Sequence, residues 1–239
     1  CILDSWIEDE IMQNIATENN LAETAFIVNN GNGYDIRWFT PTVEVDLCGH
    51  ATLASAFVVF HFIDTKIKEI IFHSPISGEL RVSKVDDTYY LDFPIDKIES
   101  SNIVSEIIDC IGIEPIEVFN GKTDYIAIMD SEKSVADLIP NLSAISKLDA
   151  RGLIVTAPSD NVDFVSRFFA PQSGIDEDPV TGSAHTSLIP IWSAKLKKHD
   201  MVAKQLSQRG GRLMCSHDGD RCSIGGKAKL YLVGELYIE

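Results

Sequence analysis

Residues 37–56 read RWFTPTVEVDLCGHATLASA, and residues 166–188 read SRFFAPQSGIDEDPVTGSAHTSL. The second stretch repeats much of the first, because Arg37 matches Arg167 at an offset of 130 residues and Gly49 matches Gly182 at an offset of 133. The matched pairs are Arg37/Arg167, Phe39/Phe169, Pro41/Pro171, Glu44/Glu177, Gly49/Gly182, Ala51/Ala184, Ser74/Ser207, Gly78/Gly211 and Leu80/Leu213. A repeat of this length is too long for a solenoid unit of about 20 to 50 residues. It predicts two similar domains that arose by internal duplication.

The segments around the first copy indicate the fold class. Residues 51–62 are apolar on nearly every helical face, which predicts a helix buried at the centre of a curved sheet. Upstream, the β-prone residues 24–28 and 35–40 flank a turn at 29–33, which is the pattern of a β-hairpin. We therefore predict an α+β protein in which each domain wraps a curved, mostly antiparallel sheet around one central apolar helix.

Domain boundaries follow from the charged segment 96–102, which precedes an amphipathic helix carrying Ile103, Ile107, Ile108 and Ile111. We place the boundary at residue 98, so that the domains span residues 1–98 and 99–239. Near the start of the chain, Ser5 followed by Glu8 is typical of a helix N-terminus, and this pattern predicts a helix capped at Ser5.

Composition excludes several classes of partner. The formal charge is −16 and the sequence pI is about 4.7, so nucleic acids and anionic membranes would be repelled. Five scattered cysteines without a CxxC pair fit neither a disulfide framework nor a zinc finger. With no apolar run near the roughly 20 residues needed to span a bilayer and no signal-peptide pattern, a cytoplasmic location is expected.

Each copy of the repeat places a glycine at the start of its apolar segment, Gly49 in the first and Gly182, followed by Ser183, in the second. Helix starts carry unpaired N–H groups and the positive end of the helix dipole. Two such starts facing one cleft would bind a carboxylate, so a small carboxylated metabolite is the expected ligand. The alternative is that both glycines only permit tight packing of helix against sheet.

Three side chains near these glycines are candidates for catalysis. Glu23 leads into an apolar strand, where desolvation raises the pKa of a carboxyl group and suits it to general acid/base work. His50 directly follows Gly49 and can relay a proton at neutral pH. Asp178 lies just before the second helix start, where it can orient a substrate or simply cap the helix.

Motifs for metals and nucleotides are absent from the sequence. His73 and His185 form no HxxxH or HxxE spacing with a partner, which predicts that no metal is bound. Neither GxGxxG, GxxxxGK[ST] nor GxSxG occurs, so nucleotide-dependent chemistry and the common serine-hydrolase pattern are both disfavoured. We expect no cofactor.

These motifs resemble the PhzF-like family of isomerases. The resemblance rests on NNLAETAF at 19–26 together with the two long stretches quoted above, and it covers nearly the whole chain. It implies the diaminopimelate-epimerase type of fold, a homodimer, and an active site between two domains. It also implies that Glu23 moves the proton with help from His50 and Asp178, while Gly49, Gly182 and Ser183 contact the substrate.

The best-known activity of the resembled family isomerises a dihydro-hydroxyanthranilate during phenazine formation, without a redox cofactor. The sequence departs from the family pattern in two ways. It opens at Cys1, beyond the VDAF-like and GNP-like motifs with which family members usually begin, which suggests that the sequence is truncated. Cys48 also stands where related two-thiol epimerases carry a catalytic cysteine, whereas Thr181 stands at the corresponding place in the second copy. A two-base epimerase using Cys48 and a non-catalytic binding protein therefore remain as alternatives.

Overall fold

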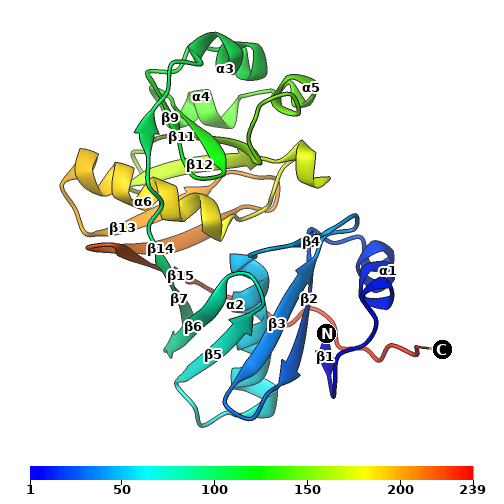
Figure 1. Ribbon diagram of the computed structural model, residues 1–239. Helices are drawn as coiled ribbons and strands as arrows, with labels where there is room; N and C mark the ends of the chain where they lie inside the picture. The colour runs from blue at the N-terminus through cyan, green and yellow to red at the C-terminus, as the bar shows by residue number, and fades with distance from the viewer. Residues whose placement is uncertain (239) are drawn as a thin grey trace.

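The computed structural model describes residues 1–238, which form two lobes that we call the first half (residues 1–98) and the second half (residues 99–238) (Figure 1). The first half contains β1 (Ile2–Leu3), α1 (Asp9–Asn19), β2 (Thr24–Asn29), β3 (Tyr34–Phe39), β4 (Glu44–Val45), α2 (Gly49–Val58), a π-helix (Val59–Ile63), β5 (Glu69–Ser74), β6 (Gly78–Val85) and β7 (Thr88–Pro94). The second half contains β8 (Glu99–Ser100), α3 (Val104–Ile111), β9 (Glu117–Asn120), β10 (Asp124–Ile128), α4 (Glu132–Ala136), α5 (Leu142–Ile145), β11 (Gly152–Pro158), β12 (Phe164–Phe169), a 3₁₀-helix (Pro171–Ser173), α6 (Gly182–Leu196), β13 (Asp200–Gln205), β14 (Gly211–Asp218) and β15 (Arg221–Gly226).

Strand pairing follows the same pattern in the two halves. Along β2, β3, β5, β6 and β7 the successive pairs are antiparallel, parallel, antiparallel and antiparallel. Along β11, β12, β13, β14 and β15 the sequence of directions is identical. The predicted hairpin is formed by β2 and β3, and the predicted amphipathic helix is α3. The α+β class is therefore confirmed, while duplication as the origin of the likeness stays a prediction.

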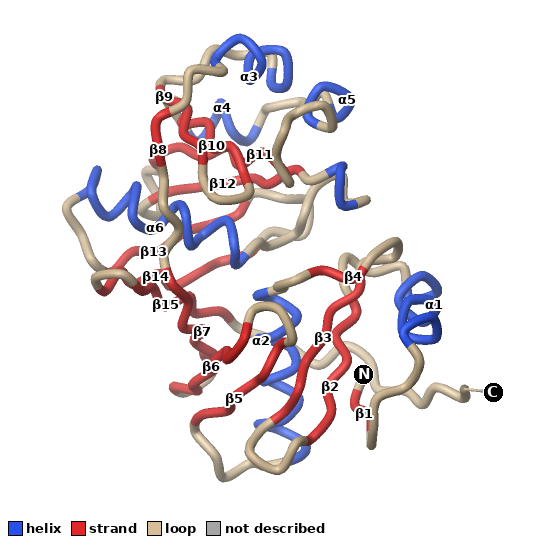
Figure 2. The backbone as a smooth tube through the Cα atoms, viewed as in Figure 1, coloured by secondary structure: helices blue, strands red, loops and turns tan. Residues whose placement is uncertain are grey.

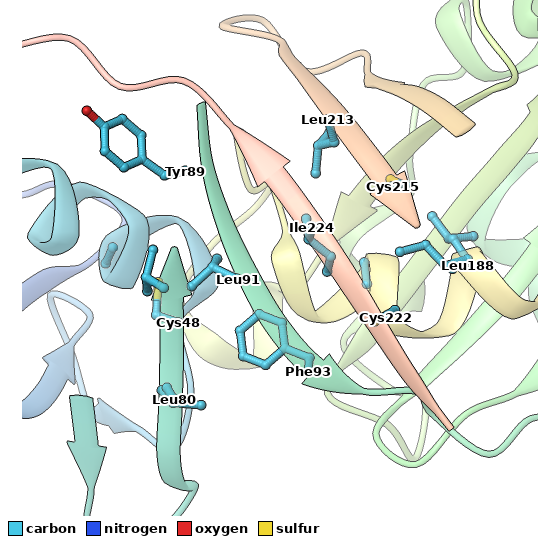
Figure 3. Close-up of a cluster of buried hydrophobic side chains, with 14 of the residues drawn as sticks. Cys48, Leu80, Tyr89, Leu91, Phe93, Leu188, Leu213, Cys215, Cys222 and Ile224 are labelled. Carbon is cyan, nitrogen blue, oxygen red and sulfur yellow. The ribbon is translucent and has the colours of Figure 1, made fainter. Parts of the chain in front are cut away.

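The two halves share one sheet and one core. The sequence predicts one sheet for each domain. In the structure, β7 and β15 pair antiparallel and join the strands of the two halves into a single 15-stranded mixed sheet. In Figure 3, Leu91 and Phe93 of β7 lie beside Cys222 and Ile224 of β15, and all four are at most 2% exposed. This common core fixes the two halves relative to each other, because close-packed interiors resist displacement.

Helices α2 and α6 pack on this sheet and touch each other. Helix α2 contacts β2 and β7, and α6 contacts β14 and β15. Nine of the residues in α6 are buried, from Gly182 to Ser193. The prediction that residues 51–62 are buried on nearly every face is wrong at the end of the segment. There the chain widens into the π-helix, and Phe62 is 56% exposed.

The first helix begins later than the sequence predicts. Helix α1 starts at Asp9 and its N-cap is Glu8, without a side-chain cap, so the predicted cap at Ser5 is wrong. At this start, Arg37 of β3 donates a hydrogen bond of 2.8 Å to the carboxylate of Asp9. Acidic residues at the first turn also interact favourably with the helix dipole.

The connection between the halves runs through β8, which pairs with β9 and is the last strand of the shared sheet on the side of the second half. The domain boundary at residue 98 stays a prediction, and Glu239, the last residue of the second predicted domain, lies outside the described residues. Beyond β15, residues 227–238 continue outside any helix or strand (Figure 2). Within residues 1–238, no helix combines the length and apolar character needed to cross a membrane.

Candidate active site

A cavity of about 720 Å³ is lined by residues of both halves, a volume typical of small-molecule sites. The six residues predicted from sequence to act on or bind a substrate all line it: Glu23, Gly49, His50, Asp178, Gly182 and Ser183. The structure thus brings together residues that are up to 160 positions apart, from Glu23 to Ser183. Their roles remain predictions.

The starts of α2 and α6 are in direct contact through their glycines. A Cβ atom added to Gly49 would lie 3.1 Å from Cα of Gly182, and one added to Gly182 would lie 3.2 Å from Cα of Gly49. The two glycines therefore permit close packing, as the alternative from the sequence had it. Each packs against the start of the other helix, and Gly49 also lies near Leu91 of the sheet. Outside their own helices, within residues 1–238, no hydrogen bond is donated by the backbone N–H groups of Gly49, His50, Gly182 or Ser183.

Glu23 immediately precedes β2, and its side chain is only 9% exposed. Its Oε2 atom lies 3.0 Å from Nε2 of His50, yet the contact is not aligned as a hydrogen bond, and this oxygen has no hydrogen-bond partner within residues 1–238. A buried carboxylate oxygen without a partner is costly. A hydrogen-bond donor or an acidic C–H group of a bound ligand would supply the partner that this oxygen lacks.

His50 reaches from α2 across to the second half. Its Nδ1 lies 3.0 Å from the carbonyl oxygen of Val180, and a carbonyl can only accept, so Nδ1 carries the proton. Nε2 is consequently the atom that gains or loses a proton beside Glu23. Burial lowers the pKa of His50, but Cys48 and Glu23 outweigh burial and raise that pKa well above its usual value. Proton binding at Nε2 is therefore favoured.

Asp178 offers a second carboxylate oxygen to the same space. Its Oδ2 accepts a hydrogen bond of 2.6 Å from the hydroxyl of Thr181, whereas Oδ1 is buried without a hydrogen-bond partner and lies 4.0 Å from Nδ1 of His50. Burial raises the pKa of Asp178, and the charge of His50 opposes that rise. The sequence allowed Asp178 to cap α6 by accepting from a backbone N–H group of the helix. In the structure its carboxylate instead accepts from the side-chain hydroxyl of Thr181, the N-cap residue of α6.

Gln205 supports the second helix start and is not apparent from the sequence. It is fully buried at the end of β13, its Oε1 accepts from the N–H of Thr181 at 2.7 Å, and its Nε2 donates to the carbonyl of Asp178 at 2.8 Å. A lone glutamine in a strand carries no motif that would reveal this role. The contact fixes the geometry of Asp178 without involving its carboxylate.

Cys48 lies beside His50, with its Sγ 3.7 Å from either ring nitrogen. Burial raises the pKa of this thiol, and the neighbouring His50 opposes that rise. Ligand atoms of Glu23, Cys48 and His50 all lie within 4.8 Å of one another, a spacing that a divalent cation could accept. The prediction that no metal is bound is not tested by this arrangement and stays a prediction.

Two basic residues of the second half, Lys122 and Arg151, also line the cavity and were not predicted. Arg151 is held by Asp124, to which it donates from Nε at 2.9 Å and from Nη2. The two partners are 27 positions apart and belong to no repeated motif. Only the pairing of β10 with β11 brings them together.

Comparison with known proteins identifies relatives of this chain. The family model for phenazine biosynthesis-like proteins, PhzC-PhzF, matches residues 1–234. An uncharacterized isomerase of Pseudomonas aeruginosa is 47% identical over 234 residues, which cover 98% of this chain and 89% of the relative. A crystal structure of a PhzF-family phenazine biosynthesis protein from Enterococcus faecalis superposes with a TM-score of 0.94 and 47% identity, covering 99% of this chain and 91% of that one.

A more distant structure, of a predicted epimerase from Pseudomonas aeruginosa, has a TM-score of 0.76 and 16% identity, with coverage of 100% of this chain and 93% of that chain. This likeness shows a shared fold and nothing about chemistry. The predicted isomerase class is confirmed by the names that the bacterial relatives carry. The family model and the close relatives together show that this chain belongs to the PhzC-PhzF family of phenazine biosynthesis-like proteins.

Proposed function

We propose that this chain is a cofactor-independent isomerase that shifts a proton on a small carboxylated metabolite, with Glu23 as general acid/base in the cavity between the two halves. The observation that carries the proposal is that Glu23 lines the cavity and that its buried Oε2 has no hydrogen-bond partner within residues 1–238. A partly desolvated carboxylate in hydrogen-bond reach of a substrate is suited to proton transfer.

In the proposed reaction, the N–H groups at the starts of α2 and α6 hold the substrate carboxylate. Glu23 takes a proton from one carbon, and the electron pair of that C–H bond moves into the substrate as its double bond migrates. The resulting carboxylic acid then returns the proton to a second carbon. Proton and electrons balance within the substrate and Glu23, so the step needs no redox partner.

His50 and Asp178 assist in this proposal. Nε2 of His50 lies 3.0 Å from Oε2 of Glu23, so the imidazole can hold that carboxylate in position for proton transfer. Asp178, with one oxygen free, can accept a hydrogen bond from a substrate amine or hydroxyl. Gly49, Gly182 and Ser183 bind the substrate through their N–H groups or, for Ser183, the hydroxyl.

We also infer an internal duplication, cytoplasmic location and a homodimer. Duplication is supported by the identical strand pairing and by matching ion pairs. Arg37 donates from Nε to Glu44 at 2.7 Å, and Arg167 donates from Nε to Glu177 at the same distance. The homodimer and the cytoplasmic location rest on the family resemblance and on the cysteine content.

The test is solvent deuterium incorporation. Wild-type protein is incubated in deuterated water with a panel of small carboxylic acids that includes trans-2,3-dihydro-3-hydroxyanthranilate, and product mass and proton NMR signals are followed. Glu23→Gln keeps the shape of the side chain but removes the base, so turnover should fall by at least about 100-fold. Glu18→Gln, an exposed position on α1, is the matched control and should behave as wild type.

Near-normal turnover by Glu23→Gln would falsify the assignment of the base. If no acid of the panel gains deuterium although some raise the melting temperature, the chain is a binding protein of the same fold. The epimerase alternative makes a different prediction, loss of activity on removal of Cys48, which is taken up below.

A further inference from the structure

Arg151 provides a fixed positive group in the proposed active-site cavity. It lies one residue before β11, and its backbone N–H donates to the carbonyl of Thr123 at 2.7 Å. Its side chain is 31% exposed and lines the same cavity as Glu23 and Gly182. Lys122, in the loop between β9 and β10, lines that cavity as well.

The guanidinium plane is held in place on one edge and on one face. Nε and Nη2 both donate to the carboxylate of Asp124, which is 3% exposed, and the guanidinium carbon lies 5.1 Å from the ring centroid of Phe168. Nη1 has no hydrogen bond within residues 1–238. An arginine held in this way keeps a preorganised pair of donors, Nη1 and the outer hydrogen of Nη2, for a planar acceptor.

The ion pair with Asp124 uses only part of the guanidinium group. Nε and Nη2 each donate to one oxygen of the Asp124 carboxylate, so that both oxygens are satisfied without Nη1. Burial lowers the pKa of Arg151, while Asp124 and, further away, Asp178 and Glu23 outweigh burial and raise it. The positive charge is thus felt by the carboxylates of the site.

We propose that Arg151, together with Lys122 of the same cavity lining, binds a second carboxylate of the substrate, so that the substrate of this enzyme is a small dicarboxylate. This inference rests on the proposed function for the first carboxylate, which lies at the starts of α2 and α6. A singly charged, planar group fits better than a phosphate dianion, because Glu44, Asp46 and Asp96 also line the cavity and repel higher negative charge. Specificity would then come from the distance between two carboxylate sites.

The experiment compares acids of equal carbon number. Binding of succinate against butyrate, and of glutarate against valerate, is measured by calorimetry at constant ionic strength. Wild-type protein should bind at least one dicarboxylate about tenfold more tightly than its monocarboxylate match, since one charge-assisted contact is worth about that factor. Arg151→Met should lose this preference while its affinity for the monocarboxylate is unchanged.

Two further variants make the result decisive. Arg221→Met removes an arginine that pairs with Asp92 outside the cavity, and it should keep the full preference. The double variant Arg151→Met/Asp124→Asn removes both charges of the pair, so it tests binding even where the single variant leaves Asp124 buried and unpaired. Equal affinity of wild type for the members of both pairs, or a preference that survives in the folded double variant, would overturn the proposal.

Failure here is distinguishable from failure of the proposed function. The preference for dicarboxylates is a binding measurement, so wild type and Arg151→Met can be compared whether or not Glu23 exchanges protons. A protein that exchanges deuterium through Glu23 without preferring dicarboxylates contradicts only the role of Arg151. A protein that prefers dicarboxylates without exchange contradicts only the catalytic proposal.

Discussion

The starts of α2 and α6 match at their glycines and differ at the residues on either side. Cys48 and His50 flank Gly49, whereas Thr181 and Ser183 flank Gly182. In the first half these neighbours, together with Glu23, are groups that can exchange protons. In the second half they are hydroxyl groups, and the hydroxyl of Thr181 holds the carboxylate of Asp178.

This difference favours a one-base mechanism over a symmetrical one. A two-base racemase needs an acid and a base on opposite faces of one carbon, and related enzymes meet that need with a thiol in each half. Here the second half offers Thr181, which is already bound to Asp178 and to Gln205 at 3.0 Å. The halves thus share an order of strand pairing but carry different side chains at the two helix starts.

The largest difference is expected between the two matching arginines. Arg167→Met should cost about 3 to 4 kcal/mol of unfolding free energy, because it leaves Glu177 half-buried and unpaired and frees the carbonyls of Val135 and Leu138. Arg37→Met should cost about 1 kcal/mol, since its partners Asp9 and Glu44 remain accessible to water. Urea denaturation of both variants measures the contrast.

Salt provides the control for this comparison. The cost of Arg37→Met should shrink as ionic strength rises, because screening weakens an accessible ion pair. The cost of Arg167→Met should stay nearly constant, since part of it comes from buried carbonyl groups. Equal costs at all salt concentrations would show that the two ion pairs are energetically equivalent.

Thr52 and His185 form the next contrast, because both bind the carbonyl of the residue before their helix. Thr52 donates to Cys48 at 2.6 Å, and Nδ1 of His185 donates to Thr181 at 2.7 Å. Burial lowers the pKa of His185 to about 4, while in the unfolded chain it is near 6.5. Between these values only the unfolded chain binds the proton, so stability falls as pH falls from about 6.5 to about 4, by about 3 kcal/mol.

Replacing His185 by its counterpart isolates that contribution. His185→Thr should be less stable at pH 7, because a smaller side chain leaves space in the core, yet it should lose less stability between pH 7 and pH 5 than wild type does. Chemical denaturation at several pH values gives both slopes. If the stability of wild type and of His185→Thr depends on pH in the same way, His185 does not titrate in this range.

Much of the site follows from the sequence because its residues lie within repeated, local motifs. Glu23, His50 and Asp178 could be predicted to share a cavity from the glycine helix starts and the family resemblance. Gln205 and the Arg151–Asp124 pair could not, because each depends on which strands become neighbours. The start of α1 at Asp9 was not predicted either, and the contact that Asp9 makes with Arg37 of β3 is likewise long-range.

The glycines themselves should respond equally. Gly49→Ala and Gly182→Ala each place a methyl group against the Cα atom of the other glycine. Each substitution should lower the free energy of unfolding by about 1 to 3 kcal/mol, and the two losses should be equal within error. Gly234→Ala, where an added Cβ meets nothing within 4 Å, is the matched control. Thermal unfolding of the three variants gives the comparison. A marked inequality would show that one helix start can move away and the other cannot.

Cys48→Ala should have the smallest effect, and it separates the isomerase from the epimerase. Cys48 is 4% exposed and burial raises the pKa of its thiol, so we expect the side chain to pack beside His50 and not to act as a base. We expect a loss of about 1 kcal/mol in stability from the lost packing and turnover within about threefold of wild type. Deuterium exchange in the same carboxylic-acid panel measures the second quantity. A fall in turnover comparable to that of Glu23→Gln would instead make Cys48 the second acid/base of an epimerase, because one buried sulfur that only packs cannot account for two orders of magnitude in rate.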